Sequence, residues 1–129
     1  MRFLLDTCVV IWYFEGSDQI TEGVRDLLTD PENEVYMSDV SILEVVIKYM
    51  TGKFPLEAPP SKILPTLAEK HSLACLPLQQ EAIFRLESLP PLHRDPFDRL
   101  LIAQSLEHGL TLVTPDLQIR QYELSTLWE

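Results

Sequence analysis

The sequence contains few cysteines and few basic residues, and each shortage excludes a class of protein. Two cysteines in 129 residues cannot form a disulfide scaffold, so we expect Cys8 and Cys75 to be reduced and buried among apolar neighbours. Only 10 lysines and arginines oppose 20 acidic residues, and the resulting net charge of −10 argues against a simple cationic nucleic-acid-binding face. Apolar runs stay well below the ~20 residues that cross a bilayer, and Asp6 comes too early for a signal peptide. We therefore expect a soluble, cytoplasmic protein with no membrane partner.

What is present is a regular alternation of short apolar segments and helical patterns. The length of 129 residues suits a single domain, residues 1–129, with no repeat or long linker. We expect strands at 3–5, 35–37, 74–76 and 110–113, with a terminal edge strand at 126–128. We expect helices at 7–14, 21–29, 40–50, 61–71 (capped by Ser61), 79–86 and 95–109, and a last short helix starting at 114–116. This order predicts an α/β fold in which helices cover both faces of a mostly parallel sheet, with sites beyond the carboxyl ends of the strands.

The most informative segment is a pair of aspartates at the head of an apolar helix. Asp95 is a natural N-cap, and the proline that follows it suits the first helical turn. Asp98 lies one turn further in, where Leu101 and Ile102 are its neighbours on the ridge expected to be buried. Asp95 instead leans toward Arg99. A carboxylate on a buried ridge needs a cation, so Asp98 is a candidate ligand.

Four acids lie at the ends of expected strands or in the helices beside them: Asp6, Glu44, Asp98 and Asp116. Each alone has a structural explanation, because Asp is a common helix cap and Ser41-x-x-Glu44 matches a capping box. Together they form a cluster in which carboxylates 4 Å apart repel by ~4 kcal/mol per pair. Glu44 also lies in line with Val40 and Ile47 on an apolar face. Oxygen ligands of this kind select Mg²⁺ or Mn²⁺, and such a site suits hydrolysis of a phosphodiester.

Several other residues are candidates for supporting roles near these acids. Lys48, Lys53, Arg94 and Arg99 are the basic residues in the acid-bearing segments. Lys48 also fits a plain i,i+4 pair with Glu44, and Arg94 and Arg99 fit surface pairs with Asp95. Thr7 and Thr114 could hold the acids through their hydroxyls or could cap helices. We expect His93 to be a loop histidine, with a proton-shuttling role as the alternative.

At these residues the chain resembles the PIN-domain family, and within it the VapC-type toxins of toxin–antitoxin pairs. The matching segments are residues 3–7, residues 38–48 with Gly52 and Lys53, residues 93–104, and residues 114–116 with Tyr122. The resemblance implies a three-layer α/β/α fold, Mg²⁺- or Mn²⁺-dependent endoribonuclease activity, a homodimer and an antitoxin partner. The acidic quartet of the family falls on Asp6, Glu44, Asp98 and Asp116, with Asp95 as an accompanying acid.

One position departs from the common pattern, and two other functions compete with the nuclease. Many family members have Asn where this chain has Cys8, which removes one polar group beside the site. A phosphotransferase of the haloacid-dehalogenase type also begins with a strand and an aspartate, but Cys8 occupies the place of its second acid. The non-catalytic alternative is a PIN-like interaction module whose acids only cap helices, which the net charge favours and the intact quartet opposes.

Overall fold

A five-stranded sheet forms the centre of the computed structural model, which describes residues 1–128. The strands are β1 (Arg2–Leu5), β2 (Glu34–Ser38), β3 (Ala74–Leu76), β4 (Thr111–Val113) and β5 (Thr126–Leu127). Their order across the sheet is β3-β2-β1-β4-β5, and all four pairings are parallel. The carboxyl ends of the strands therefore meet at one edge, with β1 at the centre.

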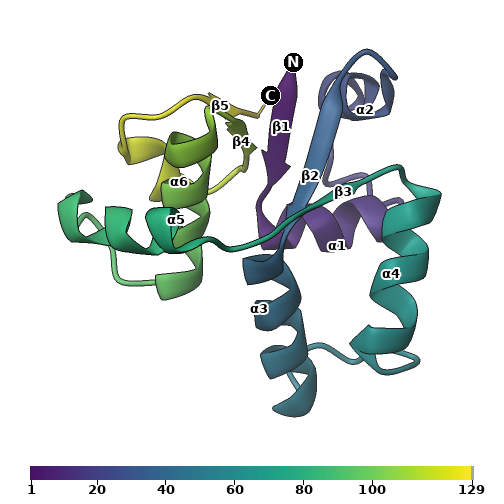
Figure 1. Cartoon of the computed structure of the whole chain (residues 1–129). Coiled ribbons are helices and arrows are strands. Elements are labelled where there is room, and N and C mark those ends of the chain that lie inside the picture. The colour runs from purple at the N-terminus through teal and green to yellow at the C-terminus, as the bar shows by residue number, and fades with distance from the viewer. Residues whose placement is uncertain (129) are drawn as a thin grey trace.

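Helices flank this sheet on both faces (Figure 1). They are α1 (Thr7–Glu15), α2 (Glu22–Thr29), α3 (Asp39–Met50), α4 (Pro60–Lys70), α5 (Gln80–Arg85) and α6 (Pro96–His108), with 3-10 turns at Leu86–Ser88 and Ile119–Gln121. In Figure 1, α5 and α6 lie on one side of the strands, α1, α2 and α4 lie on the other, and α3 projects from the end of β2. The expected parallel α/β architecture is confirmed.

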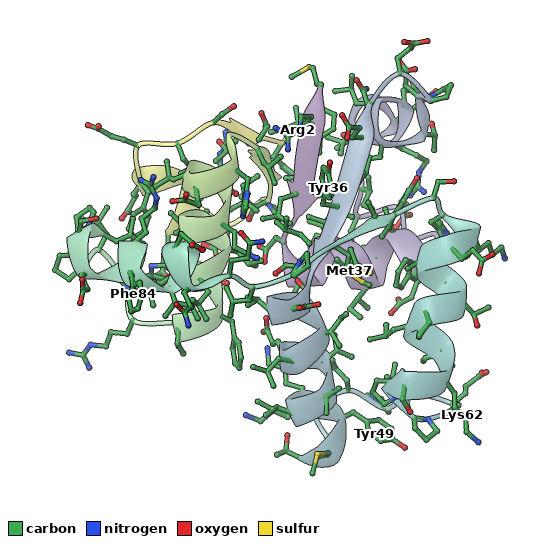
Figure 2. All side chains as sticks on the ribbon, viewed as in Figure 1. Arg2, Tyr36, Met37, Tyr49, Lys62 and Phe84 are labelled. Carbon is green, nitrogen blue, oxygen red and sulfur yellow. The ribbon has the colours of Figure 1, made fainter. Side chains whose placement is uncertain are left out.

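The two faces of the sheet bury separate apolar clusters, because successive side chains of a strand point to opposite sides. On β1, Phe3 and Leu5 belong to the cluster under α1 and α2, whereas Leu4 belongs to the cluster under α6. The neighbouring strand alternates in the same way, with Met37 in the first cluster and Tyr36 packed against the second (Figure 2). The central strands are covered on both sides, which is why their sequences are continuously apolar.

Capping residues explain where the helices beside the sheet begin and end. Asp6, Ser38 and Asp95 are the N-caps of α1, α3 and α6, and each side chain accepts a hydrogen bond from a backbone N–H of its helix. Gly109 ends α6 in the left-handed conformation, with φ of 65°, that glycine adopts without strain. The caps place the starts of these three helices at the carboxyl edge of the sheet.

Four local expectations are wrong. Residues 114–116 do not start a helix, because side chains of Thr114 and Asp116 accept hydrogen bonds from backbone N–H groups two residues further on and form turns instead. Ser61 does not cap α4, which begins one residue earlier with Pro59 as its N-cap. Cys75 is exposed, since β3 is an edge strand, and Cys8 is half-buried; both are free thiols.

A buried polar contact fixes α6 against the end of β2. The Ser38 hydroxyl donates to Gln104 Oε1 and also accepts from the backbone N–H of Val40, so it links the start of α3 to α6. Gln104 Nε2 donates to the backbone oxygen of Pro77 at 3.3 Å. Both polar side chains are fully buried and hydrogen-bonded, so this contact sets the spacing of the two helices.

Among residues 1–128, no helix combines the length and the apolar character that crossing a bilayer requires.

Replacing Gln104 by leucine should destabilise the fold, because the substitution leaves the Ser38 hydroxyl hydrogen without its acceptor and the Pro77 carbonyl without its donor. We expect the free energy of unfolding to fall by about 1–3 kcal/mol in urea denaturation. Gln19→Leu changes an exposed glutamine and should stay within about 0.5 kcal/mol of the wild type. Equal stability of the two variants would show that the buried contact contributes nothing.

Candidate active site

The first acid of the site, Asp6, lies directly after β1 and is almost fully buried. Its Oδ1 accepts from the backbone N–H of Thr7 at 2.7 Å, and its Oδ2 accepts from the hydroxyl of Thr114 at 2.8 Å. The Cys8 thiol lies 3.7 Å from the same Oδ2 and donates to it. Burial and the charge of Asp6 raise the pKa of this thiol, so it stays protonated and acts as a donor. Asp6 is thus both the N-cap of α1 and a carboxyl group held in place at the carboxyl end of the central strand β1.

Thr114 connects the acids that follow β1 and β4. While its hydroxyl donates to Asp6, its oxygen accepts from the backbone N–H of Asp116 at 3.0 Å. Asp116 Oδ1 in turn accepts from the backbone N–H of Gln118 at 2.8 Å. One threonine therefore orients the side chain of Asp6 and the turn that carries Asp116, which is the supporting role expected for it.

Glu44 lies beyond the first turn of α3 and is not part of a cap, because Ser38 caps this helix. The capping-box interpretation of Ser41-x-x-Glu44 is therefore wrong. Lys48 Nζ donates to Glu44 Oε2 at 2.6 Å, which confirms the expected i,i+4 pair. Glu44 Oε1 is buried and has no hydrogen-bond partner within residues 1–128. A buried carboxylate oxygen without a donor is costly, and a bound cation would satisfy it.

Neighbouring residues of α1 and α3 bring Glu44 toward Asp6. The hydroxyls of Thr7 and Ser41 form a buried hydrogen bond of 2.9 Å. Ser41 and Glu44 are three residues apart on α3 and share a face of the helix. Ile47 was expected on the same buried face, but it is 41% exposed because the second half of α3 projects beyond the sheet.

The two aspartates at the head of α6 have different environments. Asp95 is exposed, and its Oδ1 accepts from the backbone N–H groups of Phe97 and Asp98. The Asp98 side chain is only 15% exposed, and its Oδ2 lies 3.3 Å from His93 Nε2. Leu101 and Ile102 are fully buried beside it, as the ridge predicted.

The expected pairing of Arg99 with Asp95 is wrong. Arg99 donates instead to the backbone oxygens of Leu89 and Pro90 and to the Tyr122 hydroxyl. Asp95 already uses Oδ1 for the two N–H groups of its own helix, which leaves Arg99 free to close the preceding loop. Arg94 and Lys53 are exposed, so Lys48 is the basic side chain that contacts the acids directly.

The four acids lie near enough to one another for their charges to affect each other's pKa values. Burial raises the pKa of Asp98 from 3.8 to about 8, and the charges of Asp6, Asp95, Asp116 and Glu44 add to this rise. Burial likewise raises the pKa of Asp6 from 3.8 to about 6, against the lowering effects of its donors Thr114 and Thr7 and with further contributions from Glu44 and Asp116. The pKa of Lys48 is raised above its usual value, mainly by the hydrogen bond to Glu44. The site therefore accumulates negative charge that only protons or cations can compensate.

The donor set fits a hard divalent ion held partly through water. No group of three or more His, Cys, Asp or Glu side chains in the described part of the chain is close enough to hold an ion directly. Mg²⁺ commonly keeps several waters and binds one or two carboxylates, so it does not need a complete protein cage. The buried Glu44 Oε1, which has no hydrogen-bond partner within residues 1–128, is an oxygen that such an ion would satisfy.

His93 and Tyr122 lie in the segments that resemble the family, but neither was predicted to be one of the site residues. The His93 side chain is only 6% exposed and lies between the Tyr122 hydroxyl and Asp98. Its expected place in a loop is confirmed, but burial beside a candidate ligand was not predicted. The sequence feature that could have indicated this burial is the position of His93, two residues before the Asp95 cap. Residues 90–96 around it contain three prolines in seven positions.

Comparison with known proteins assigns the family. A family model described as PIN domain matches residues 3–124. This chain belongs to the PIN-domain family. Its membership of this family excludes the haloacid-dehalogenase alternative. A comparison with curated protein sequences found no significant match.

Solved structures of low sequence identity share the fold of this PIN domain. A chain of VapBC2 from Rickettsia felis, bound to a promoter DNA fragment, has a TM-score of 0.74 at 16% identity, covering 100% of both chains. DNA-bound VapBC from Salmonella typhimurium gives a TM-score of 0.68 at 16% identity, covering 98% of this chain and 97% of the other. VapBC-5 from Mycobacterium tuberculosis, a member of a toxin–antitoxin family, gives 0.56 at 20% identity, covering 98% and 95%.

The raised pKa of Asp98 should make the metal-free PIN domain lose stability as pH rises. The unfolded carboxyl ionises near 3.8 and the folded one near 8, so between these values the unfolded state releases its proton more readily. In chelator, the melting temperature of Asp98→Asn should therefore exceed that of the wild type, and the difference should grow from about pH 4 to about pH 8. Each kcal/mol of difference in unfolding free energy corresponds to roughly 4 °C in melting temperature.

The exposed Asp18→Asn variant should follow the wild-type curve at every pH, which separates the effect of the site from the effect of net charge. A constant difference between Asp98→Asn and the wild type across this range would contradict the raised pKa.

Proposed function

We propose that this chain is a metal-dependent endoribonuclease that serves as the toxin of a toxin–antitoxin pair. The observation that carries the proposal is the proximity of Asp6, Glu44, Asp98 and Asp116, where burial and then the charges of the neighbouring acids raise the pKa values of Asp6 and Asp98. Membership of the PIN-domain family supports the same conclusion.

The chain's own residues have distinct roles in this proposal. Asp6, Asp98 and Asp116 would hold Mg²⁺ or Mn²⁺ partly through water molecules, and Glu44 would contribute directly or through water. When bound, the ion lowers the pKa of a water and neutralises charge at the scissile phosphate of the RNA. The backbone N–H of Thr7 and the hydroxyl of Thr114 fix the carboxyl of Asp6, and Lys48 holds Glu44 and adds positive charge beside it.

The metal also reconciles an acidic protein with an anionic substrate. The net charge of −10 would repel RNA at long range. A divalent ion in the acidic cluster converts the local potential from negative to one that binds phosphate. RNA recognition in this proposal therefore depends on the ion rather than on a basic surface.

We further propose a cognate antitoxin and a homodimer. Several structural relatives were solved as VapBC complexes, which supports an antitoxin partner. Leu43, Ile47 and Met50 are exposed at helical spacing on one face of α3, a stripe that suits contact with a second copy. Phe84 is also exposed, on the outer side of α5 (Figure 2).

The competing function is a PIN-like interaction module without catalysis. It is favoured by the caps, since Asp6 and Asp95 both serve as N-caps and need no metal to explain them. It does not explain Glu44, which caps no helix and keeps one buried oxygen without a partner in residues 1–128. The two functions differ in whether the acids are needed for chemistry.

The purified protein should cleave structured RNA in Mg²⁺ or Mn²⁺ and not in chelator. Asp6→Asn should lower the cleavage rate at least about 100-fold, because it removes a charged group that acts on the transition state. The rate is measured on an end-labelled RNA by gel electrophoresis. Asp18→Asn is the matched control at an exposed position and should cleave like the wild type. Undiminished cleavage by Asp6→Asn, or cleavage in chelator, would favour a contaminating nuclease and contradict the proposal.

Asp98→Asn should reduce cleavage far more than Asp95→Asn. Asparagine caps a helix about as well as aspartate, so Asp95→Asn removes only an exposed charge and should change the rate no more than a few-fold. Asp98→Asn removes the charge of a mostly buried carboxylate proposed as a metal ligand and should reduce the rate by about 100-fold or more. Both rates are measured at saturating Mn²⁺, and the reverse order would show that Asp95 is the ligand.

A further inference from the structure

The hydroxyl of Tyr122 joins three segments beside the candidate site. Tyr122 follows the 3-10 turn Ile119–Gln121 and is buried. Its oxygen accepts from the backbone N–H of His93 at 3.2 Å and from Arg99 Nη1 at 3.0 Å. A third contact of 3.0 Å connects it to Nδ1 of the His93 ring.

Hydrogen-bond capacity determines the direction of that third contact. A backbone N–H and a guanidinium N–H can only donate, so they occupy the acceptor lone pairs of the phenolic oxygen. The hydroxyl has one hydrogen, and Nδ1 of His93 is the partner left for it. A hydrogen on Nδ1 would instead direct three donors at one oxygen and leave the buried hydroxyl hydrogen without an acceptor.

The ring of His93 therefore carries its hydrogen on Nε2, which faces Asp98 Oδ2 at 3.3 Å. The reverse arrangement, with the Asp98 carboxyl donating to Nε2, would require a hydrogen on Nδ1 and conflicts with the bonds at Tyr122. Within residues 1–128, Asp98 Oδ1 has no hydrogen-bond partner, so this oxygen remains available to a cation.

We propose that Tyr122 and Arg99 hold His93 as an Nε2–H donor, and that His93 is a positioning residue which orients Asp98 for metal binding. The proposal rests on the proposed function as far as the metal is concerned. Arg99 closes the loop by donating to Leu89 and Pro90, and His93 packs edge-on against Tyr122 with ring centroids 5.5 Å apart. The hydrogen bond occupies one carboxyl oxygen and restricts rotation of the group, which presents the other oxygen in a fixed direction.

The first test measures the tautomer in the metal-free protein by ¹⁵N NMR of histidine-labelled chain. We expect the His93 signals to show a protonated Nε2 and an unprotonated Nδ1, assigned by their loss in His93→Gln. Tyr122→Phe should release this preference and give a mixture of tautomers. Tyr36→Phe, which removes a hydroxyl bonded to exposed Glu34, is the matched control and should leave the spectrum unchanged.

The second test measures Mn²⁺ affinity by calorimetry and by electron paramagnetic resonance. His93→Ala should weaken binding by about 10-fold, as removal of a group that orients a metal ligand commonly does. His93→Gln keeps an N–H donor at similar reach and should restore most of the affinity. Circular dichroism verifies that each variant is folded.

An Nδ1–H tautomer in the wild type would overturn the proposal, and so would wild-type Mn²⁺ affinity in His93→Ala. Equal loss of affinity in the Ala and Gln variants would assign His93 a packing role only and would also overturn it. Failure of the wild type to bind Mn²⁺ contradicts the proposed function instead, and the tautomer measurement still decides the hydrogen-bond assignment.

Discussion

Mutual repulsion among four carboxylates at the carboxyl edge of the sheet is the constraint around which this fold is arranged. Without an ion, each acid is kept in place by a donor from its surroundings. In the order Asp6, Glu44, Asp98 and Asp116, the donors are the Thr114 hydroxyl, the Lys48 ammonium, the His93 ring and the Gln118 backbone N–H. None of these donors removes the charge entirely, and burial together with the charges of the neighbouring acids raises the pKa of Asp98 to about 8. The scaffold therefore holds an arrangement that a cation would relax, which is a form of preorganisation.

Two buried polar contacts keep the segments that carry these acids in register. The Thr7–Ser41 hydrogen bond joins α1 to α3, and the Ser38–Gln104 contact joins α3 to α6. Apolar packing alone is tolerant of small slides between helices, whereas a buried hydrogen bond has a defined length and direction. The polar contacts therefore set the positions of the acids more narrowly than the two apolar clusters could.

Local rules explain why the fold and the four acids could be predicted from the sequence. Apolar strands that alternate with capped helices define a parallel sheet, and the Asp95 cap and the buried ridge of α6 follow from helix geometry. The predictions that were wrong concern contacts and exposure that the tertiary structure determines. Segments distant in sequence determine which partners Arg99 contacts and how far His93 is buried. They also determine the exposure of Ile47 and Cys75. The spacing of residues along the chain does not predict such contacts. The same side chain can cap a helix and belong to a candidate site, so the cap formed by Asp6 does not argue against its proposed role as a ligand.

The position of β4 in the sheet has a consequence for how the protein is made. β1 lies at the centre and pairs with β2 on one side, but its other neighbour, β4, is more than 100 residues later in the chain. Thr114 and Asp116 follow that strand, so Asp6 lacks its hydroxyl donor until they have been synthesised. Because chains emerge from the ribosome N-terminus first, at about 5–20 residues per second, the nascent chain passes several seconds with an incomplete site. The order of the strands thus keeps Asp6 without its Thr114 donor until most of the chain has been synthesised.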